Sequence, residues 1–479
     1  MTCSKNPKWI VTFICGWLLA GAQAVAVEVA KPHPLFTDHL VLQRDRAVPV
    51  WGTAEDGQKV TVSIAGQTVS TTAENGRWQV QLEPLAAGGP HELVIEGPDR
   101  TVVQDVLVGE VWICSGQSNM EWPLRAAHES SDDIADSTNE HIRLFMAPNR
   151  AADEPQSTVD AEWTKCTPDT VANFSAVGYY FGRALKQHLD VPIGLISCDW
   201  GGTPAEAWTS REALAADEDL KHYVAQERDP NNKNRPYGLY NGMLRPLVPY
   251  GIRGAIWYQG ESNAGQAYEY RTLFPAMITD WREQFGQGDF PFLFVQLAPF
   301  MKIVEEPGDS AWAELREAQL MTMQNVPNTA MAVITDVGEE NDIHPRKKLP
   351  VGERLALAAR ALAYGEDIVY SGPILAEATP SDDGMYLKFK HTGEGLESRD
   401  GKLTGFAIAG ADKKFHNAEA KIVGPDTVLV RSDQVDSPVA VRYGWASFPL
   451  GNLWNSAGLP ASPFRTDEFP GVTQKKRQL

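Results

Sequence analysis

The stretch Gly109-Glu-Val-Trp-Ile-Cys-Ser-Gly-Gln-Ser118-Asn-Met-Glu-Trp-Pro123 decides how the rest of the chain is interpreted. Its apolar residues 111–114 predict the end of a buried strand, and Gly116 allows a sharp turn directly after it. Ser118 is therefore expected at the carboxyl end of a strand, where open α/β sheets bind ligands. A serine after such a turn is more often a turn residue or a helix cap than a nucleophile, so other segments must decide its role.

Length and charge limit the possible classes of protein. The chain has 479 residues, which is enough for two or three domains with separate cores. Its formal net charge is −19. Because nucleic acids and anionic membrane surfaces are also negatively charged, neither is expected as a partner. A neutral or small substrate fits this charge better, and nothing in the sequence indicates an oligomeric state.

The first 24 residues have the pattern of an export signal. Lys5 and Lys8 precede an apolar run at residues 9–20, and Ala22-Gln23-Ala24 forms a small-residue cleavage site. The run is shorter than the ~20 residues that span a membrane comfortably. We therefore expect a signal peptide at residues 1–24 and an exported protein, periplasmic or extracellular, with no membrane anchor after cleavage. The alternative is an uncleaved anchor.

Three cysteines remain after residue 24, namely Cys114, Cys166 and Cys198. They are too few for a disulfide framework, and their spacing matches no metal site. Cys114 lies four residues before Ser118, and Cys198 lies four residues before Gly202. These two are expected at matching positions of neighbouring strands, where they could pair, although buried free thiols are the simpler expectation.

The hydrophobic pattern divides the chain into three domains after the signal. Residues 25–105 alternate polar and apolar positions and predict an N-terminal β-sandwich. Residues 106–364 alternate apolar runs with helical stretches and predict an α/β domain with a parallel sheet. Its expected strands are 106–114, 142–146, 191–198, 252–258, 290–297 and 329–335, and its expected helices are 175–189, 209–219, 268–285, 311–324 and 349–364. Residues 365–479 predict a C-terminal β-rich domain.

Two motifs that follow strands could supply hydrogen-bond donors to an oxyanion. Gly201 and Gly202 come after the strand at 191–198, and a glycine pair lets backbone N–H groups approach a substrate closely. Gln259-Gly-Glu-Ser-Asn263 follows the strand at 252–258; Gln259 or Asn263 could donate, and Glu261 could orient a histidine. The alternatives are a plain turn for the glycines and a helix cap for the second motif.

A serine nucleophile also needs a general base. Among the ten histidines, His344 alone lies in a loop after the last expected sheet strand with a carboxylate, Asp342, two residues upstream. A nearby carboxylate selects the imidazole tautomer and stabilises the imidazolium that forms during catalysis. The alternative is an ordinary surface histidine in an acidic loop.

Together these segments resemble the SGNH hydrolase superfamily and, more closely, the sialate O-acetylesterase family of carbohydrate acetyl esterases. The resemblance is carried by residues 112–122, 201–208, 239–243, 257–263 and 342–345, and residues 35–44 and 458–467 also look like bacterial members. It implies a flavodoxin-like three-layer sandwich between β domains, no metal or other cofactor, and release of acetate from acetylated sugars. By this resemblance Ser118 is the nucleophile, the glycine pair belongs to the second block, and His344 is the general base.

Two departures leave roles open. Superfamily members usually carry the acid three residues before the histidine, where this chain has Asn341. Asp342 could take that role, because residues two apart in an extended segment share a face. In related acetylxylan esterases the glutamate of Gln-Gly-Glu is thought to act as the acid, which makes Glu261 the rival. Asn263 is one residue out of register with the superfamily's third-block asparagine.

The sequence thus predicts a serine esterase that removes O-acetyl groups from carbohydrates, first of all from O-acetylated sialic acid, through an acetyl-enzyme intermediate. Arg125 could bind the sialate carboxylate. Trp122 and Trp208 could stack on a sugar ring, with core packing as the alternative. The other functions considered are an acetyl esterase of xylan or another plant polysaccharide, a non-catalytic carbohydrate-binding protein, and a glycosidase, which would leave a Ser-His pair without a purpose.

Overall fold

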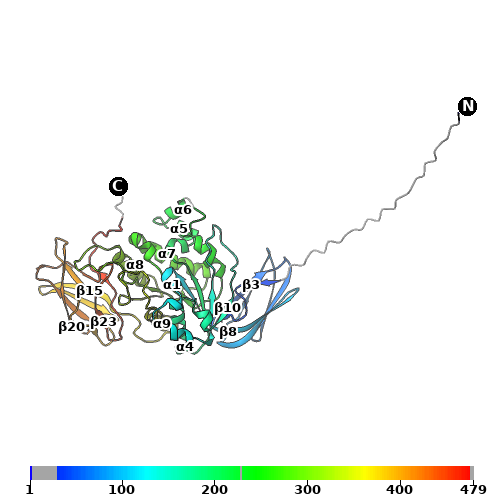
Figure 1. Cartoon of the computed structure of the whole chain (residues 1–479), viewed down its shortest axis with the longest axis horizontal. Coiled ribbons are helices and arrows are strands. Elements are labelled where there is room, and N and C mark those ends of the chain that lie inside the picture. Colours follow the sequence, from blue (N-terminus) through cyan, green and yellow to red (C-terminus); the bar gives the residue numbers. More distant parts are fainter. Residues whose placement is uncertain (3–29, 227–228, 475–479) are drawn as a thin grey trace.

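The structure is a computed structural model that describes residues 1–2, 30–226 and 229–474. Apart from its first two residues, the predicted signal peptide lies outside the described residues. Figure 1 shows the α/β domain (cyan to green) between the N-terminal strands (blue) and the C-terminal strands (yellow to orange). In the described part of the chain, no helix is both long and apolar enough to cross a membrane.

The central sheet has the strand order β10-β9-β11-β8-β12-β13-β14. All neighbouring pairs are parallel except β10 with β9 at one edge. Such sheets are buried on both faces, which explains the continuous apolar runs and confirms the predicted α/β class. The bounds are β8 (Arg100–Gly116), β9 (Asn139–Met146), β10 (Trp163–Cys166), β11 (Ile193–Asp199), β12 (Gly254–Tyr258), β13 (Phe292–Val295) and β14 (Thr329–Ala332).

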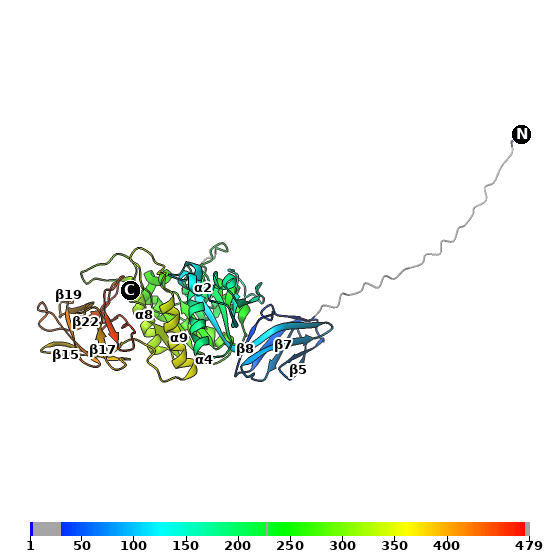
Figure 2. The ribbon, with the colours of Figure 1, turned by 60° about the horizontal axis from the view of Figure 1, so that its bottom comes forward.

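Helices cover both faces of this sheet. α4 (Ala176–Leu189) and α9 (Leu349–Tyr364) share one buried core with Trp112 of β8. α7 (Ala267–Phe285) and α8 (Ala311–Asn325) share the other core with Trp257 of β12. Figure 2 shows α8, α9 and α4 one after another from the C-terminal strands toward the N-terminal strands. The shorter helices are α1 (Ser118–Glu121), α2 (Ser131–Ala135), α3 (Pro168–Val171), α5 (Arg211–Ala216) and α6 (His222–Ala225).

The position of β8 determines where a site can form. β11 lies on one side of β8 and β12 on the other, so the chain changes direction across the sheet at this strand. Loops that follow β8, β11 and β12 therefore meet at one edge, as at the switch points of doubly wound sheets. Gly116 ends β8 with φ +140°, and a Cβ there would lie 2.2 Å from the carbonyl oxygen of Tyr258. The turn into Ser118 thus requires glycine.

The N-terminal strands are continuous with the central sheet. Strand β8 runs across the predicted domain boundary between residues 105 and 106. Its first half pairs antiparallel with β7, and its second half lies in the parallel sheet. β2 (Val41–Gln43), β4 (Lys59–Ile64), β5 (Gln67–Thr72) and β7 (Gly88–Glu96) join this sheet, while β1 (Lys31–Pro32), β3 (Val48–Thr53) and β6 (Arg77–Leu82) form a separate one.

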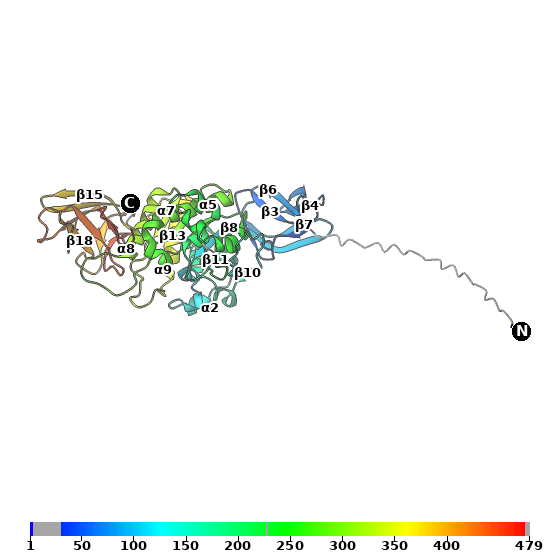
Figure 3. The ribbon, with the colours of Figure 1, turned by 90° about the horizontal axis from the view of Figure 1, so that it is seen from above.

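The C-terminal strands form three small sheets, seen at one end of the molecule in Figure 3. Their strands are β15 (Ile374–Ser381), β16 (Gly384–Lys390), β17 (Leu396–Ser398), β18 (Phe406–Ala409), β19 (Phe415–Asn417), β20 (Glu419–Gly424), β21 (Thr427–Arg431), β22 (Ala440–Tyr443), β23 (Leu453–Asn455) and β24 (Phe464–Arg465). Arg316 of α8 is buried and donates to the carbonyl oxygens of Leu297 and Ala446, both at 2.7 Å. This side chain thus joins the segment after β13 to the segment after β22.

The cysteines correct one expectation. Cys114, Cys166 and Cys198 are free and buried. In the register of β8 with β11, Cys114 is opposite Ser197, and Cys198 is opposite Ser115. The two thiols are therefore one residue out of step, and because strand side chains alternate they lie on opposite faces of the sheet. The predicted matching positions were wrong, whereas the simpler expectation of buried free thiols is confirmed.

Candidate active site

The structure brings Ser118 and His344 together across 226 positions of the chain. Ser118 begins α1 directly after the turn that ends β8. His344 lies in the loop between β14 and α9, and its Nε2 is 2.9 Å from Ser118 Oγ. Both side chains are half-buried. A hydroxyl in hydrogen-bond contact with an imidazole can be deprotonated as it attacks a carbonyl.

Asp342 is the carboxylate beside the histidine ring. Its Oδ1 accepts the backbone N–H of His344 at 2.9 Å and lies 3.4 Å from His344 Nδ1. Burial lowers the pKa of His344 below its usual value, and Asp342 opposes this shift by favouring the charged ring. The ring is therefore neutral at neutral pH, as a general base requires.

Glu261 has a different environment. It begins the short helix η5 (Glu261–Gln266), and its Oε1 accepts a hydrogen bond of 2.6 Å from Asn119 Nδ2. The same Nδ2 donates to the carbonyl oxygen of Ile343 at 3.0 Å. Burial raises the pKa of Glu261. Glu261 is thus connected to the histidine loop through Asn119, whereas Asp342 faces the ring itself.

The two predicted sugar-stacking tryptophans have different positions. Trp122 lies against His344, with ring centroids 5.2 Å apart and planes inclined by 20°, and it lines the pocket in front of Ser118. Trp208 is fully buried, donates from Nε1 to Thr203 Oγ1 at 2.9 Å and packs edge-on against Trp257. Because its ring has no exposed face, the substrate-stacking prediction for Trp208 is wrong.

The glycine pair lies against the serine. A Cβ on Gly201 would come within 3.2 Å of Ser118 Cβ, so the backbone passes very close to Ser118. The Gly201 N–H already donates to Glu121 Oε2 at 2.6 Å. Gly202 is exposed and has φ +70°. Within the described residues, the N–H groups of Ser118 and Gly202 donate to no protein acceptor, which leaves both available to a ligand.

The amides of Gln259 and Asn263 belong to a buried network behind the glycine turn. Gln259 Nε2 donates to Thr203 O at 3.2 Å and to Asn263 Oδ1 at 2.7 Å. Asn263 Oδ1 also accepts from Ala205 N at 2.9 Å, and its Nδ2 donates to Glu206 Oε2 at 2.9 Å. Neither residue lines the pocket that contains Ser118. The structure thus places both amides behind the segment that follows the glycine pair and not in the pocket beside Ser118.

A pocket of about 700 Å³ opens in front of Ser118 and His344. Its other lining residues are Glu121, Trp122, Pro123, Arg125, Met146, Ala147, Pro148, Asn149, Asn173, Ser175, Ser197 and Asp199. Among the described residues, the exposed Arg125 is the only arginine or lysine in this lining. Glu121 and Asp199 contribute carboxyl groups. From the described residues, the pocket therefore offers many polar groups, the Arg125 cation and the indole ring of Trp122 beside the imidazole of His344.

Asp199 is a buried carboxyl group on the wall of this pocket. Burial raises the pKa of Asp199 to about 7, while the hydrogen bond from Ser197 Oγ, 2.6 Å long, acts in the opposite direction. The pKa of an aspartate in an unfolded chain is about 4. Between these values the folded protein holds one more proton here than the unfolded chain does, so this site's contribution to stability is lost as pH rises.

We therefore expect Asp199→Asn, which cannot ionise, to gain stability relative to the unsubstituted protein as pH rises. The gain between pH 4 and pH 8 should be about 2–4 kcal/mol, measured as the free energy of urea unfolding at each pH. The exposed Asp136, changed to Asn, is the control and should show no such dependence. A difference for Asp199→Asn that does not change with pH would contradict the neutral state of this carboxyl.

Several residues of the site were not predicted. Met146 ends β9 and Ala147 to Asn149 follow it, so the rule that placed the other motifs at strand ends could have found them. Glu121 lies within the first motif. Lys348, which is buried and donates to Asn119 Oδ1 at 2.5 Å, follows the histidine motif and carries no recognisable signal.

The chain is similar to known proteins over most of its length. A family described as "Carbohydrate esterase, sialic acid-specific acetylesterase" matches residues 108–360. The human sialate O-acetylesterase is 32% identical over 483 residues, which cover 90% of this chain and 92% of the human protein. The mouse sialate O-acetylesterase is 32% identical over 504 residues, which cover 89% of this chain and 92% of the mouse protein. A carbohydrate acetylesterase from Xanthomonas citri, known from its crystal structure, is 43% identical with a TM-score of 0.86, over 92% of this chain and 100% of that one.

Proposed function

The chain belongs to the carbohydrate esterase family of sialic acid-specific acetylesterases, which makes it a carboxylic ester hydrolase, and we propose that it removes O-acetyl groups from carbohydrates with Ser118 as nucleophile and His344 as general base. The observation that carries this proposal is the 2.9 Å contact between His344 Nε2 and Ser118 Oγ. A non-catalytic carbohydrate-binding protein would have no use for this contact. Export of the protein is proposed from the pattern of residues 5–24 alone.

The reaction follows from the positions of these groups. Ser118 Oγ attacks the acetyl carbonyl carbon while its proton moves to His344 Nε2, and Asp342 stabilises the imidazolium. The proton then passes to the sugar oxygen as the ester bond breaks, which leaves an acetyl group on Ser118. Water, deprotonated by His344, attacks this acetyl group, and acetate leaves as Ser118 regains its proton.

We propose the N–H groups of Ser118 and Gly202 as the donors to the oxyanion. Both are free in the described part of the chain, whereas the N–H of Gly201 is held by Glu121. Gln259 and Asn263 support the glycine turn from behind, because their amides are engaged with Thr203, Ala205 and Glu206. This division of roles replaces the sequence-based hypothesis that one of these amides donates to the oxyanion itself.

For the substrate, O-acetylated sialic acid is the first candidate. Sialic acid carries a carboxylate, and the exposed guanidinium of Arg125 at the pocket supplies a matching cation. Acetylated xylan or another neutral plant polysaccharide is the second candidate. The carboxyl groups of Glu121 and Asp199 on the same pocket favour it, because they accept hydrogen bonds from sugar hydroxyls and repel an anionic sugar when ionised.

Acetate release from O-acetylsialic acid, acetylxylan and an aryl acetate tests both candidates. If sialate is the substrate, Arg125→Ala should raise KM for O-acetylsialic acid about tenfold or more and leave acetylxylan and the aryl acetate unchanged, because a charge-assisted hydrogen bond contributes roughly 1.5–3 kcal/mol. The exposed Arg211, changed to Ala, is the control. Equal effects of Arg125→Ala on all three esters, or release of acetate from acetylxylan alone, would rule out the sialate proposal.

A further inference from the structure

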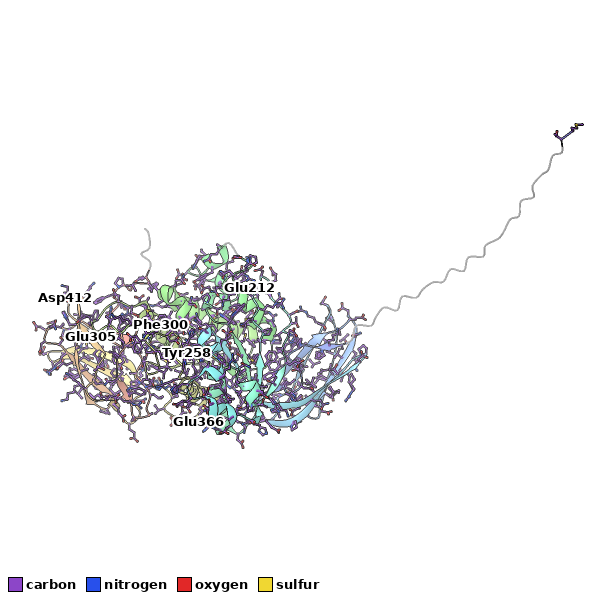
Figure 4. The ribbon with its side chains drawn as sticks, in the orientation of Figure 1. Glu212, Tyr258, Phe300, Glu305, Glu366 and Asp412 are labelled. Carbon is purple, nitrogen blue, oxygen red and sulfur yellow. The ribbon has the colours of Figure 1, made fainter. Side chains whose placement is uncertain are left out.

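A lysine lies buried behind the reacting pair. Lys348 directly precedes α9 and is 1% exposed. Its ammonium group donates to Asn119 Oδ1 at 2.5 Å and lies 5.3 Å and 5.7 Å from the ring centroids of Tyr258 and Trp122. Figure 4 labels Tyr258 near the centre of the α/β domain. Burying an ammonium group is costly unless it is paired, and the reaction described above does not use this one.

The contact with Lys348 fixes the orientation of the Asn119 amide. Because an ammonium group can only donate, it must face the amide oxygen. Nδ2 is then directed to Glu261 Oε1 and to the carbonyl oxygen of Ile343, at 2.6 Å and 3.0 Å. Asn119 directly follows the nucleophile, and Ile343 directly precedes the base. One side chain thus joins the backbone beside Ser118 to the backbone beside His344.

The same network places a lysine and a carboxyl group on the two sides of Asn119, namely Lys348 and Glu261. The second oxygen of Glu261, Oε2, is buried without a hydrogen-bond donor in the described part of the chain. Lys348 and His344 also contact the same indole, since Trp122 stacks on the imidazole. The charged groups that act on Lys348 are Glu261 from η5 and, from its own loop, Asp342 and Glu339.

We infer that Lys348 is a positioning residue for the proposed esterase reaction: through Asn119 it holds the loop of His344 against α1, and its charge, balanced by Glu261, opposes protonation of His344. This inference rests on the proposed function. Burial lowers the pKa of Lys348 to about 7, so the ammonium group is charged in the acidic range where His344 titrates. The groups that face His344 are Asp342, which favours the imidazolium, and Lys348, which disfavours it.

Lys348→Met tests this role through the pH profile of kcat/KM on an aryl acetate. The acid limb, where His344 becomes protonated, should move to higher pH by about half a unit or more, because a nearby positive charge has been removed. The maximum of kcat/KM should fall about tenfold or more as the Asn119 amide loses its fixed orientation. Lys347→Met, an exposed neighbour, is the matched control and should behave like the unsubstituted protein.

Glu261→Gln in the Lys348→Met background gives the opposite test, and Lys348→Arg stays informative if Lys348→Met does not fold. Glu261 also raises the pKa of Lys348, so its direct effect on His344 is measured only where no lysine can lose its charge; there, removing the anion should move the acid limb back to lower pH. Lys348→Arg keeps the positive charge and should leave the limb close to its original position. A limb of Lys348→Met that coincides with that of Lys347→Met, or a limb of Lys348→Arg that moves to higher pH, overturns the inference. The pKa of His344, followed by NMR in a Ser118→Ala background, gives the same answer without activity, so failure of the esterase proposal remains distinguishable.

Discussion

Ser118→Ala is expected to lower kcat for acetyl-ester hydrolysis by about 10⁴-fold or more and to leave stability almost unchanged. In the proposed reaction the hydroxyl forms the bond to the acetyl group, and no other described side chain hydrogen-bonds to His344 Nε2 in its place. Ser118 is half-buried, and its hydroxyl makes no hydrogen bond to any described residue other than His344. The rate of aryl-acetate hydrolysis measures the loss of kcat, and thermal unfolding measures the change in stability.

His344→Gln should cause a loss of similar size, and the double variant should be no worse than either single one. Groups that act as a unit are strongly non-additive, because removing the base leaves the nucleophile inactive. Ser262→Ala is the control, since Ser262 is an exposed serine in a neighbouring motif. A serine-reactive phosphonate should label Ser118 alone. Labelling of another residue would contradict the assignment of this pair. So would a double variant whose loss of kcat equals the product of the two single losses.

The sequence predicted the strands and the edge of the sheet at which the site forms because both depend on local patterns. Buried parallel strands are apolar throughout, and a ligand site follows their carboxyl ends. Ser118 and His344 could be found in this way, although 226 positions separate them. The division at residues 105 and 106 was placed where the pattern changes, yet β8 continues through it. A change of pairing partner within one strand leaves no mark in its composition.

The directions of individual side chains could not be predicted in the same way. Trp208 and Trp122 both lie near strand-end motifs, but one ring is in the core and the other faces the pocket. Gln259 and Asn263 have suitable chemistry for an oxyanion, yet buried partners from other segments engage their amides. Such partners are set by tertiary contacts. Lys348 was missed for the same reason, because only folding shows that it is buried beside Asn119.

Gly116→Ala should have the second largest effect, because it acts on both folding and catalysis. We expect a loss of unfolding free energy of roughly 3 kcal/mol or more, from a positive φ together with a backbone clash, and a fall in kcat/KM of about 10³-fold. The added Cβ would lie 2.2 Å from Tyr258 O, and the next residue, Gln117, donates its N–H to that same oxygen at 3.0 Å. The methyl group must therefore push β8 and β12 apart where Ser118 is held.

Gly265→Ala is the matched control for this substitution. Gly265 lies in η5 near the same edge of the sheet, and a Cβ there would meet no atom within 4 Å. Urea unfolding and aryl-acetate hydrolysis should therefore be nearly unchanged in this control, while Gly116→Ala loses both stability and activity. If Gly116→Ala kept full activity, the nucleophile would not depend on the close contact between β8 and β12. The loops alone would then determine the position of Ser118, and the turn at Gly116 would not be required for activity.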